Sequence, residues 1–313
     1  MKFLISKEED LDKEWDVIII GGGPAGYSSA LFSSRYGLKT LVITENVGGT
    51  LLEANIIENY PGIRKISGKE LSIKLKEHAE SYGAKTYIDK VIDIKKDKFF
   101  IVKTANGKEF YSKAIILATG SKRKKLNVPG ENLKGVSYCA ECDAPLYKNK
   151  VVAVIGGGNT AFHDASILLH YAKKVYIIHR KESFSADKME IERVRKAGAE
   201  FLLNRIVERI EGKGRVEKLI LRNLKDGRLE ELRVDGIFVA IGLEPSIDLA
   251  KKMGLELENN RIKVNECMET SMKGVFACGD IVFRPCKLNL IVSAVYEGAL
   301  AAFSAYRYIK SLR

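Results

Sequence analysis

Two glycine-rich segments constrain this 313-residue chain more than any other feature, because each directly follows an apolar run. Residues 21–26 read Gly-Gly-Gly-Pro-Ala-Gly, and residues 156–161 read Gly-Gly-Gly-Asn-Thr-Ala. Both fit the G-x-G-x-x-G/A fingerprint, whose small residues allow a tight turn, close approach of a pyrophosphate and close packing of a helix on a strand. Each segment therefore predicts a dinucleotide site at a helix N-terminus.

The first segment has the surroundings that this fingerprint requires. Residues 15–20 are apolar and β-branched, which predicts a strand buried on both faces. A helix is expected over 24–36 and a second strand over 38–43. Glu45 follows Gly26 at about the 20-residue spacing at which an acid bonds a ribose hydroxyl. The alternative for Glu45 is a solvated loop charge.

The second segment differs where the cofactor is selected. Residues 151–155 predict a strand, 159–171 a helix and 174–178 the next strand. His179-Arg180-Lys181 then stands where an acid would favour NAD, and a basic residue there accommodates the 2′-phosphate of NADP. Arg180 suits a bidentate phosphate clamp, and Lys181 a point charge. The alternative is a basic strand end that faces water.

One close cysteine pair, Cys139-Ala140-Glu141-Cys142, lies between the two segments. The charged N-terminus lacks the apolar core of a signal peptide, and no apolar run is long enough for a membrane span. We therefore expect a reducing cytosol, where such a pair is catalytic or metal-binding more often than structural. Asp143 follows directly, either as a carrier of the proton that disulfide exchange requires or as a cap for the next turn.

The other three cysteines do not extend this motif. A structural zinc site needs a second pair of ligands, and neither Cys267, Cys278 and Cys286 nor the four histidines have a suitable spacing. We expect no metal site. Cys278 and Cys286 are expected to be buried thiols or substitutions without a redox function.

Further segments match one known family. Residues 138–143 resemble the active-site motif of the low-molecular-weight thioredoxin reductases, and 156–161 with His179-Arg180-Lys181 resemble their NADPH site. Residues 116–120 and 274–280 resemble their flavin motifs, and 48–50 and 58–62 their flavin-contacting loops. The resemblance covers roughly residues 15–310 and is specific in combination.

The resemblance implies an electron path. FAD would occupy the first fingerprint and NADPH the second, and electrons would reach a Cys139–Cys142 disulfide through the flavin. Cys142 would contact the flavin, Cys139 would attack the disulfide of thioredoxin or a glutaredoxin-like protein, and Asp143 would be the acid/base. The implied FAD-binding residues are Gly21, Gly23, Pro24, Ala25, Gly26, Thr44, Glu45, Gly48, Gly49, Thr50, Asn59, Val91, Ala118, Thr119, Gly120, Gly279, Asp280, Leu290 and Ile291. The implied NADPH-binding residues are Gly156, Gly158, Asn159, Thr160, Ala161, His179, Arg180 and Lys181.

Four positions depart from the family pattern. Lys181 replaces a frequent second arginine, and Ser185 stands near the place of another basic residue. Thr50 replaces a glutamine, and Asn289-Leu290 replaces an Arg-Gln pair, which removes a cation and an amide. The changes at Lys181 and Ser185 favour use of NADH beside NADPH. All four departures leave open a same-fold reductase that uses ferredoxin or reduced flavin as donor, although the intact 156–161 loop argues against it. A separate alternative is a flavin redox sensor without turnover.

The expected fold is α/β, with two Rossmann-like domains in three layers and small antiparallel β elements. We place a discontinuous FAD domain at 1–126 and 247–313, and an NAD(P)H domain at 127–246. Residues 85–112 predict antiparallel strands with a turn at Asn106-Gly107, and 293–308 a C-terminal helix. The resemblance implies a homodimer. The net charge of +12 is not read as nucleic-acid binding, since no binding fold accompanies it; it suits steering of an acidic partner or a solvated surface.

Overall fold

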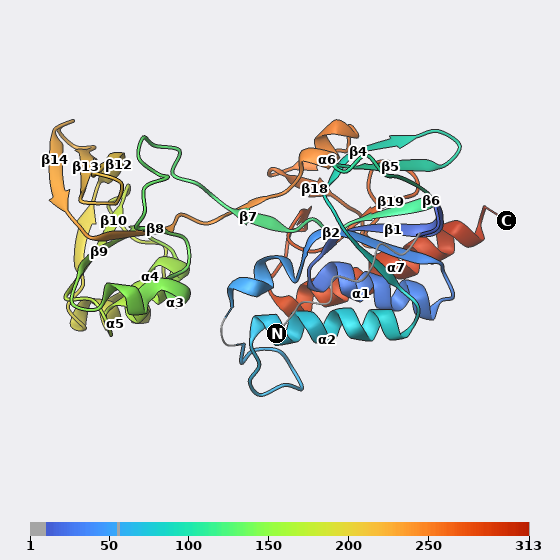
Figure 1. The fold of residues 1–313 in the computed structure, drawn as a ribbon, viewed down its shortest axis with the longest axis horizontal. Coiled ribbons are helices and arrows are strands. Elements are labelled where there is room, and N and C mark those ends of the chain that lie inside the picture. Colours follow the sequence, from blue (N-terminus) through green and yellow to red (C-terminus); the bar gives the residue numbers. More distant parts are fainter. Residues whose placement is uncertain (1–10, 55–56, 313) are drawn as a thin grey trace. The chain divides into compact units, whose positions relative to one another are not determined.

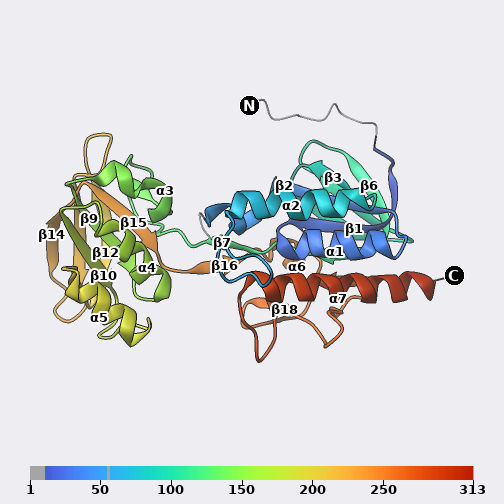
Figure 2. The ribbon, with the colours of Figure 1, turned by 90° about the horizontal axis from the view of Figure 1, so that it is seen from below.

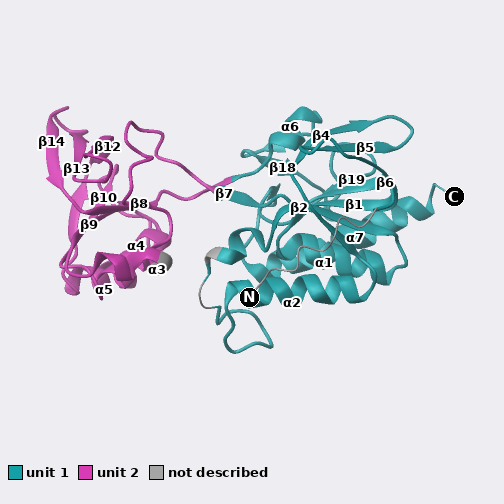
Figure 3. Ribbon diagram, in the orientation of Figure 1, with its two compact units in different colours: residues 1–122, 245–313 teal, residues 123–244 magenta. Residues whose placement is uncertain are grey.

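The computed structural model describes residues 11–54 and 57–312, without the side chains of Glu53, Glu141 and Cys142. The chain forms two compact units (Figure 3). Unit 1 comprises Met1–Lys122 and Pro245–Arg313, and unit 2 comprises Arg123–Glu244. The sequence predicted these boundaries a few residues later, after residues 126 and 246.

Unit 1 is built on a mainly parallel sheet, with its three long helices packed on one face. Its strands are β1 (Glu14–Gly22), β2 (Thr40–Val47), β3 (Lys85–Ile88), β4 (Val91–Lys96), β5 (Phe100–Thr104), β6 (Glu109–Leu117), β17 (Leu257–Glu258), β18 (Arg261–Lys263), β19 (Val275–Ala277) and β20 (Val282–Phe283). Its helices are α1 (Pro24–Arg35), the 3-10 helix η1 (Gly49–Glu53), α2 (Gly68–Ser81), α6 (Asp248–Lys252) and α7 (Ile291–Lys310). The main sheet runs β3-β2-β1-β6-β5-β4, and β19 pairs with the second half of β6.

Burial on both faces of β1 explains its continuous apolar sequence. Ile18 and Ile20 belong to one core with the β4–β5 hairpin and α6, while Val17 and Ile19 belong to another with α1, α2 and α7. All four side chains are buried, as expected for a central parallel strand. Unit 1 therefore has three layers, and Figure 1 shows α1, α2 and α7 together beneath the sheet.

Helices α1 and α7 lie side by side (Figure 2) because small residues line their contact. The Ser28 hydroxyl donates to the carbonyl oxygen of Val295 at 2.6 Å. A methyl group on Gly298 would overlap the carbonyl oxygen of Ala25. This close approach brings α7 against the first turn of α1, which contains Ala25.

Unit 2 repeats the parallel-sheet design. Its strands are β8 (Val136–Ser137), β9 (Val151–Gly156), β10 (Lys174–His179), β11 (Glu200–Leu203), β12 (Arg205–Glu211), β13 (Lys218–Asn223), β14 (Leu229–Arg233) and β15 (Gly236–Ala240). Its helices are α3 (Ala140–Asp143), the 3-10 helix η2 (Ala144–Tyr147), α4 (Asn159–Leu168) and α5 (Lys188–Lys196). The parallel sheet runs β11-β10-β9-β15-β8, and β12-β13-β14 form an antiparallel sheet. Where the chain passes from one unit to the other, β7 (Ser121–Arg123) pairs with β16 (Leu243–Pro245).

Most expected elements are present, with shifted ends. The α4 helix ends at Leu168 rather than 171, because His170 and Tyr171 make tighter i→i−3 hydrogen bonds that close the last turn. The α7 helix begins at Ile291, two residues before the expected start. The turn at Asn106-Gly107 is confirmed, with Gly107 at φ +82. No helix within 11–54 and 57–312 is long and apolar enough to cross a membrane.

Candidate functional site

In unit 1, close contacts within the protein explain why two of the three fingerprint residues are glycines. Gly21 has φ +114, and a methyl group there would overlap the carbonyl oxygen of Ala118 on the neighbouring chain segment. A methyl group on Gly26 would overlap the carbonyl oxygen of Gly21. Strand, turn and helix are therefore packed backbone to backbone at these positions.

At Gly23, neither the backbone conformation nor a contact with the described residues explains why a glycine is present. Its φ is −83, and the nearest atom to an added Cβ is the carbonyl oxygen of Gly48, at 3.8 Å. In unit 2, Gly158 matches it, with φ −99 and the Ser185 hydroxyl at 3.7 Å. Each caps a helix without a side-chain cap, so the first N–H groups of α1 and α4 have space before them. Both cradles thus fit a pyrophosphate.

Other predicted flavin residues of unit 1 gather at the carboxyl ends of its strands. Thr44 accepts a hydrogen bond from the backbone N–H of Gly22 at 2.9 Å. The Gly48 N–H donates to the carbonyl oxygen of Gly22 at 2.7 Å, which brings the 48–50 loop to the fingerprint. Ala118 follows β6, and its N–H donates to the carbonyl oxygen of Ile20 at 2.8 Å. Open α/β sheets bind ligands at this edge.

The remaining predicted flavin residues differ in exposure. Glu45, Gly49, Thr50, Asn59 and Leu290 are exposed. The Thr119 hydroxyl donates to the carbonyl oxygen of Ser246 at 2.7 Å, and Ile291 packs on the apolar cluster that contains Leu51. Val91 belongs to the core at 7 % exposure, so its side chain offers little surface to a ligand.

The second flavin motif contains charged contacts that the sequence did not predict. Glu297 on α7 accepts the N–H of Gly279 at 2.8 Å, and Lys287 donates to the carbonyl oxygen of the same residue at 2.5 Å. Arg261 donates to the carbonyl oxygen of Asp280. The sequence signal for the first two contacts was the presence of Lys287 and Glu297 in a segment, 285–306, that is otherwise uncharged.

In unit 2 the predicted nucleotide residues lie at the ends of β9 and β10. A methyl group on Gly157 would overlap the His179 ring, so this ring packs flat against the glycine turn. Burial lowers the pKa of His179, and its Nε2 has no hydrogen-bond partner among the described residues. Arg180 and Lys181 are exposed. Asn159 at the start of α4 is hydrogen-bonded to Asp187 through both its amide nitrogen and its carbonyl oxygen.

The redox cysteine and the predicted acid/base lie in one hydrogen-bonded loop of unit 2. Cys139 is disulfide-bonded; the side chain of Cys142 lies outside the described residues. The Ser137 hydroxyl is 2.7 Å from Asp143 Oδ2, to which it donates, and it accepts the N–H of Cys139 at 3.0 Å. The Asp143 N–H donates to the carbonyl oxygen of Cys139 at 3.2 Å. Ser137, which the sequence reasoning missed, thus ties the carboxylate to the cysteine.

A second anchor lies just before the cysteine. The Tyr138 hydroxyl donates to Glu131, whose other hydrogen bonds come from the N–H groups of Leu126 and Asn127 at 2.7 and 2.8 Å. Burial, together with this bond to Glu131, raises the pKa of Tyr138. Burial would raise the pKa of Glu131, but the three hydrogen bonds outweigh it and lower that pKa. Glu131 therefore links the segment that enters unit 2 to residues 137–143, the loop that holds Cys139 and Asp143. We call this segment the redox loop.

The other two expected non-redox cysteines differ in exposure. Cys278 is a buried thiol, and burial raises the pKa of its thiol to about 12. Cys286 precedes α7 and is exposed, so of the two expected alternatives it is not a buried thiol. Within the described residues no cluster of His, Cys, Asp or Glu is arranged to hold a metal ion.

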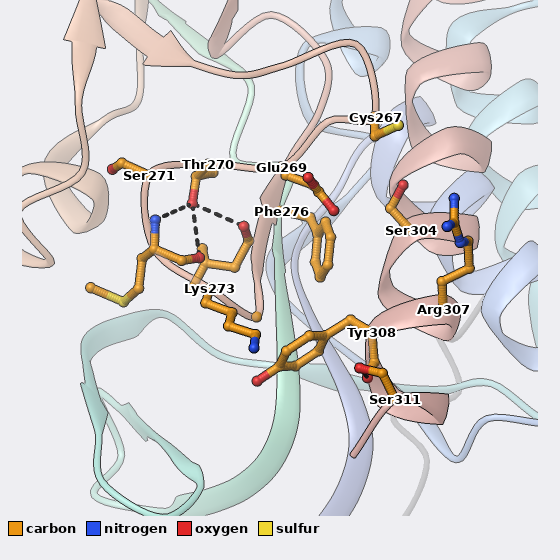
Figure 4. Close-up of a pocket in the computed structure, with 13 residues that line it drawn as sticks. Cys267, Glu269, Thr270, Ser271, Lys273, Phe276, Ser304, Arg307, Tyr308 and Ser311 are labelled. Atoms are coloured by element: carbon orange, nitrogen blue, oxygen red, sulfur yellow. Dashed lines mark hydrogen bonds between the residues drawn. The ribbon is translucent and has the colours of Figure 1, made fainter. Parts of the chain in front are cut away.

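A cavity of about 650 Å³ in unit 1 contains none of the predicted site residues (Figure 4). It lies where Gly274 leads into β19, at the opposite end of that strand from Gly279. Lys273, Arg307 and Tyr308 line it, beside the hydroxyls of Thr270 and Ser304. It is therefore distinct from the edge at which the glycine motifs meet.

Comparison with known proteins agrees with this geometry. The model of the pyridine nucleotide-disulphide oxidoreductase family matches residues 15–298. The thioredoxin reductase of Bacillus subtilis is 37 % identical over 308 residues, which cover 96 % of this chain and 97 % of that protein.

Two solved structures are also similar to this chain. The thioredoxin reductase of Lactococcus lactis has a TM-score of 0.86 at 34 % identity, covering 95 % of this chain and 99 % of that one. That of T. acidophilum has a TM-score of 0.84 at 32 % identity, covering 96 % and 100 %. This chain is therefore an oxidoreductase that belongs to the pyridine nucleotide-disulphide oxidoreductase family, among its thioredoxin reductases.

Proposed function

We propose that this chain is an NADPH-dependent thioredoxin-disulfide reductase that binds FAD in unit 1 and NADPH in unit 2. The observation that carries the proposal is the disulfide-bonded Cys139 in the unit that holds the second nucleotide cradle. The room for an added Cβ at Gly23 and Gly158, where the nearest protein atoms lie at 3.8 and 3.7 Å, supports one nucleotide in each unit. FAD held at the unit 1 cradle would supply the chemistry of accepting a hydride from a nicotinamide and of delivering two electrons to a disulfide.

The residues of the redox loop then perform the exchange. The Cys139 thiolate attacks one sulfur of the thioredoxin disulfide and forms a mixed disulfide, and the other thioredoxin sulfur leaves. Cys142 attacks the mixed disulfide at Cys139, which releases reduced thioredoxin and restores the Cys139–Cys142 disulfide. Asp143, held by Ser137, supplies and takes up the proton that these thiols exchange.

The nucleotide preference is set at the end of β10. Arg180 is exposed and suits a bidentate contact to the 2′-phosphate, with Lys181 beside it. Ser185 supplies a hydroxyl rather than a cation, and its N–H donates to the carbonyl oxygen of Gly157 at 2.8 Å. We therefore propose a preference for NADPH that is weak enough to permit some use of NADH.

An anaerobic titration of the FAD-loaded protein tests the nicotinamide step. Flavin absorbance should bleach with NADPH at low concentration and with NADH at higher concentration. Bleaching by NADH alone would contradict the role of Arg180. No bleaching by either nucleotide would overturn the nicotinamide step and favour ferredoxin or reduced flavin as the donor.

The attacking thiol has its own test. Replacing Cys139→Ser should abolish reduction of thioredoxin but leave bleaching of the flavin by NADPH. Cys267→Ser, at an exposed free cysteine outside the motif, is the matched control and should keep full turnover. Thioredoxin reduction that survives Cys139→Ser would show that another thiol attacks. Flavin bleaching without any turnover in the parent chain would instead identify a redox sensor.

The family membership supports three further proposals. The chain acts in the cytoplasm, forms a homodimer, and accepts glutaredoxin-like proteins as secondary substrates. Sedimentation equilibrium of the holoenzyme and turnover with a glutaredoxin test the last two.

A further inference from the structure

The second flavin motif of unit 1 is held by a buried ion pair. Lys287 Nζ lies 2.9 Å from Glu297 Oε2, and these side chains are only 8 % and 2 % exposed. The pair encloses Gly279, since Lys287 contacts its carbonyl oxygen at 2.5 Å and Glu297 its N–H at 2.8 Å. Both polar groups of one backbone residue thus bind opposite charges.

The pair is poorly explained as a stabilising element alone. Removing two charges from water costs several kcal/mol per ion, and a buried pair is often replaceable by apolar residues without loss of stability. Gly279 has φ +79, so the turn is one that few other residues adopt. A pair bonded to such a turn through both ions fixes its backbone orientation.

The turn lies where the two flavin motifs meet. A Cβ on Gly279 would lie 3.0 Å from the Cβ of Ala25, in the first turn of α1. Gly298, next to Glu297, packs against the carbonyl oxygen of Ala25. Arg261 on β18 holds the next carbonyl, that of Asp280. Any shift of the pair would therefore move the backbone next to the first cradle.

Lys287 also brings positive charge to this turn. Its ammonium group contacts the carbonyl oxygen of Gly279, eight residues earlier in the chain.

We propose that Lys287 and Glu297 are positioning residues of the flavin site: they fix the Gly279–Asp280 turn for FAD, and Lys287 provides the nearby cation. The inference rests on the proposed function in that unit 1 binds FAD. A cation beside the site favours addition of electrons to the flavin, whereas a carboxylate opposes it. The two ions therefore have opposite effects on the flavin potential and the same effect on FAD affinity.

Three single variants of the full chain, with one control and one double variant, test this. FAD is removed and titrated back by fluorescence, and the midpoint potential is measured against reference dyes. Lys287→Met and Glu297→Gln should each weaken FAD binding at least about tenfold: the first removes the charged donor to Gly279, and the second makes its acceptor neutral and leaves Lys287 without its counter-ion. Lys287→Met should lower the flavin potential by about 30 mV, a tenfold change for a two-electron couple, and Glu297→Gln should raise it. Lys287→Arg should retain most of the parent affinity and potential.

The control is Lys113→Met, which breaks a 2.6 Å pair with Asp16 at the amino-terminal edge of the same sheet. It should change neither quantity. A purely structural role for Lys287 and Glu297 would move both potentials in the same direction or neither, and that result would overturn the inference. Unchanged FAD affinity in both variants would do the same.

A double variant covers a failure of the single variants to fold. Lys287→Met with Glu297→Leu removes the pair without leaving one buried charge, so it is expected to fold. It should still bind FAD at least about tenfold more weakly than the parent, because Gly279 loses both partners. Parent-like affinity in a folded double variant would refute the positioning role. A parent that binds no FAD would instead overturn the proposed function, and this inference with it.

Discussion

The two glycine-rich turns are built on one plan but differ at their third small residue. In both, the first glycine lies against a neighbouring carbonyl oxygen, that of Ala118 for Gly21 and that of Ala240 for Gly156. A methyl group on Gly26 would overlap the carbonyl oxygen of Gly21, whereas unit 2 accommodates Ala161 fully buried at the matching place. The first glycine is thus set by the adjoining strand, and the third by how closely the helix approaches.

The turns also differ in the residues at the end of the second strand. Glu45 stands near the end of β2, and His179-Arg180-Lys181 at the end of β10. Under the proposed function, the cradle would supply the common affinity for a pyrophosphate, while these residues would distinguish one nucleotide from the other. The residues that shape the backbone are therefore separate from the residues that select a ligand.

The largest expected effect comes from the middle glycines. Gly23→Ala and Gly158→Ala place a methyl group where the protein has space and a pyrophosphate would pass, so each should weaken its own ligand about a hundredfold. Gly23→Ala should affect FAD, and Gly158→Ala should affect NADPH. Unfolding free energy should change by less than about 1 kcal/mol. Equilibrium titration and urea unfolding check both, and each variant is the control for the other's ligand.

A smaller effect is expected at the selecting residues. Arg180→Gln removes a charge-assisted contact worth about 1.5–3 kcal/mol, so the KM for NADPH should rise about 10- to 100-fold while that for NADH stays constant. Arg193→Gln, an exposed cation on α5, is the matched control. Equal losses for both nucleotides would show that Arg180 does not read the 2′-phosphate.

Substitution of the third small residue should lower the free energy of unfolding in both units, but for different reasons. Gly26→Ala introduces an overlap and should destabilise unit 1 by about 1–3 kcal/mol. Ala161→Gly removes a buried methyl from a helix and should cost about 1 kcal/mol. Urea unfolding of the chain measures both. A tolerated Gly26→Ala would mean that α1 can move away from β1.

The smallest effect concerns Glu131, the carboxylate that anchors the redox loop of unit 2. The pKa of Glu131 lies below its ordinary value of 4.5, so its contribution is present above that pH and is lost as the pH falls through the lowered value. Glu131→Gln should cost about 1 kcal/mol near neutral pH and nothing at strongly acidic pH. A pH-independent difference in unfolding free energy would show that the Glu131 charge is not involved.

Local patterns were enough for much of the fold. The β-branched runs and glycine spacing at 15–26 and 151–161 predicted both strand–turn–helix units, because residue type and spacing along a short segment are signals local in the sequence. Helix ends were less accurate, as at Leu168, where the last turn tightens after the apolar periodicity has ended. The exposure of Cys286 could not be decided from the sequence, because the burial of a loop residue depends on the elements that pack around it.

The sequence by itself determined the order of the chemistry: a first nucleotide fingerprint, a cysteine pair, and a second fingerprint with a basic end. Those signals are local in the chain and need no knowledge of packing. Only the tertiary structure decided that an added Cβ would fit at Gly23 and Gly158 but would overlap the backbone at Gly26, and that Ser137 holds Asp143. It also decided that Glu297 reaches Gly279 across 18 residues, because such contacts depend on where separate elements bring their side chains.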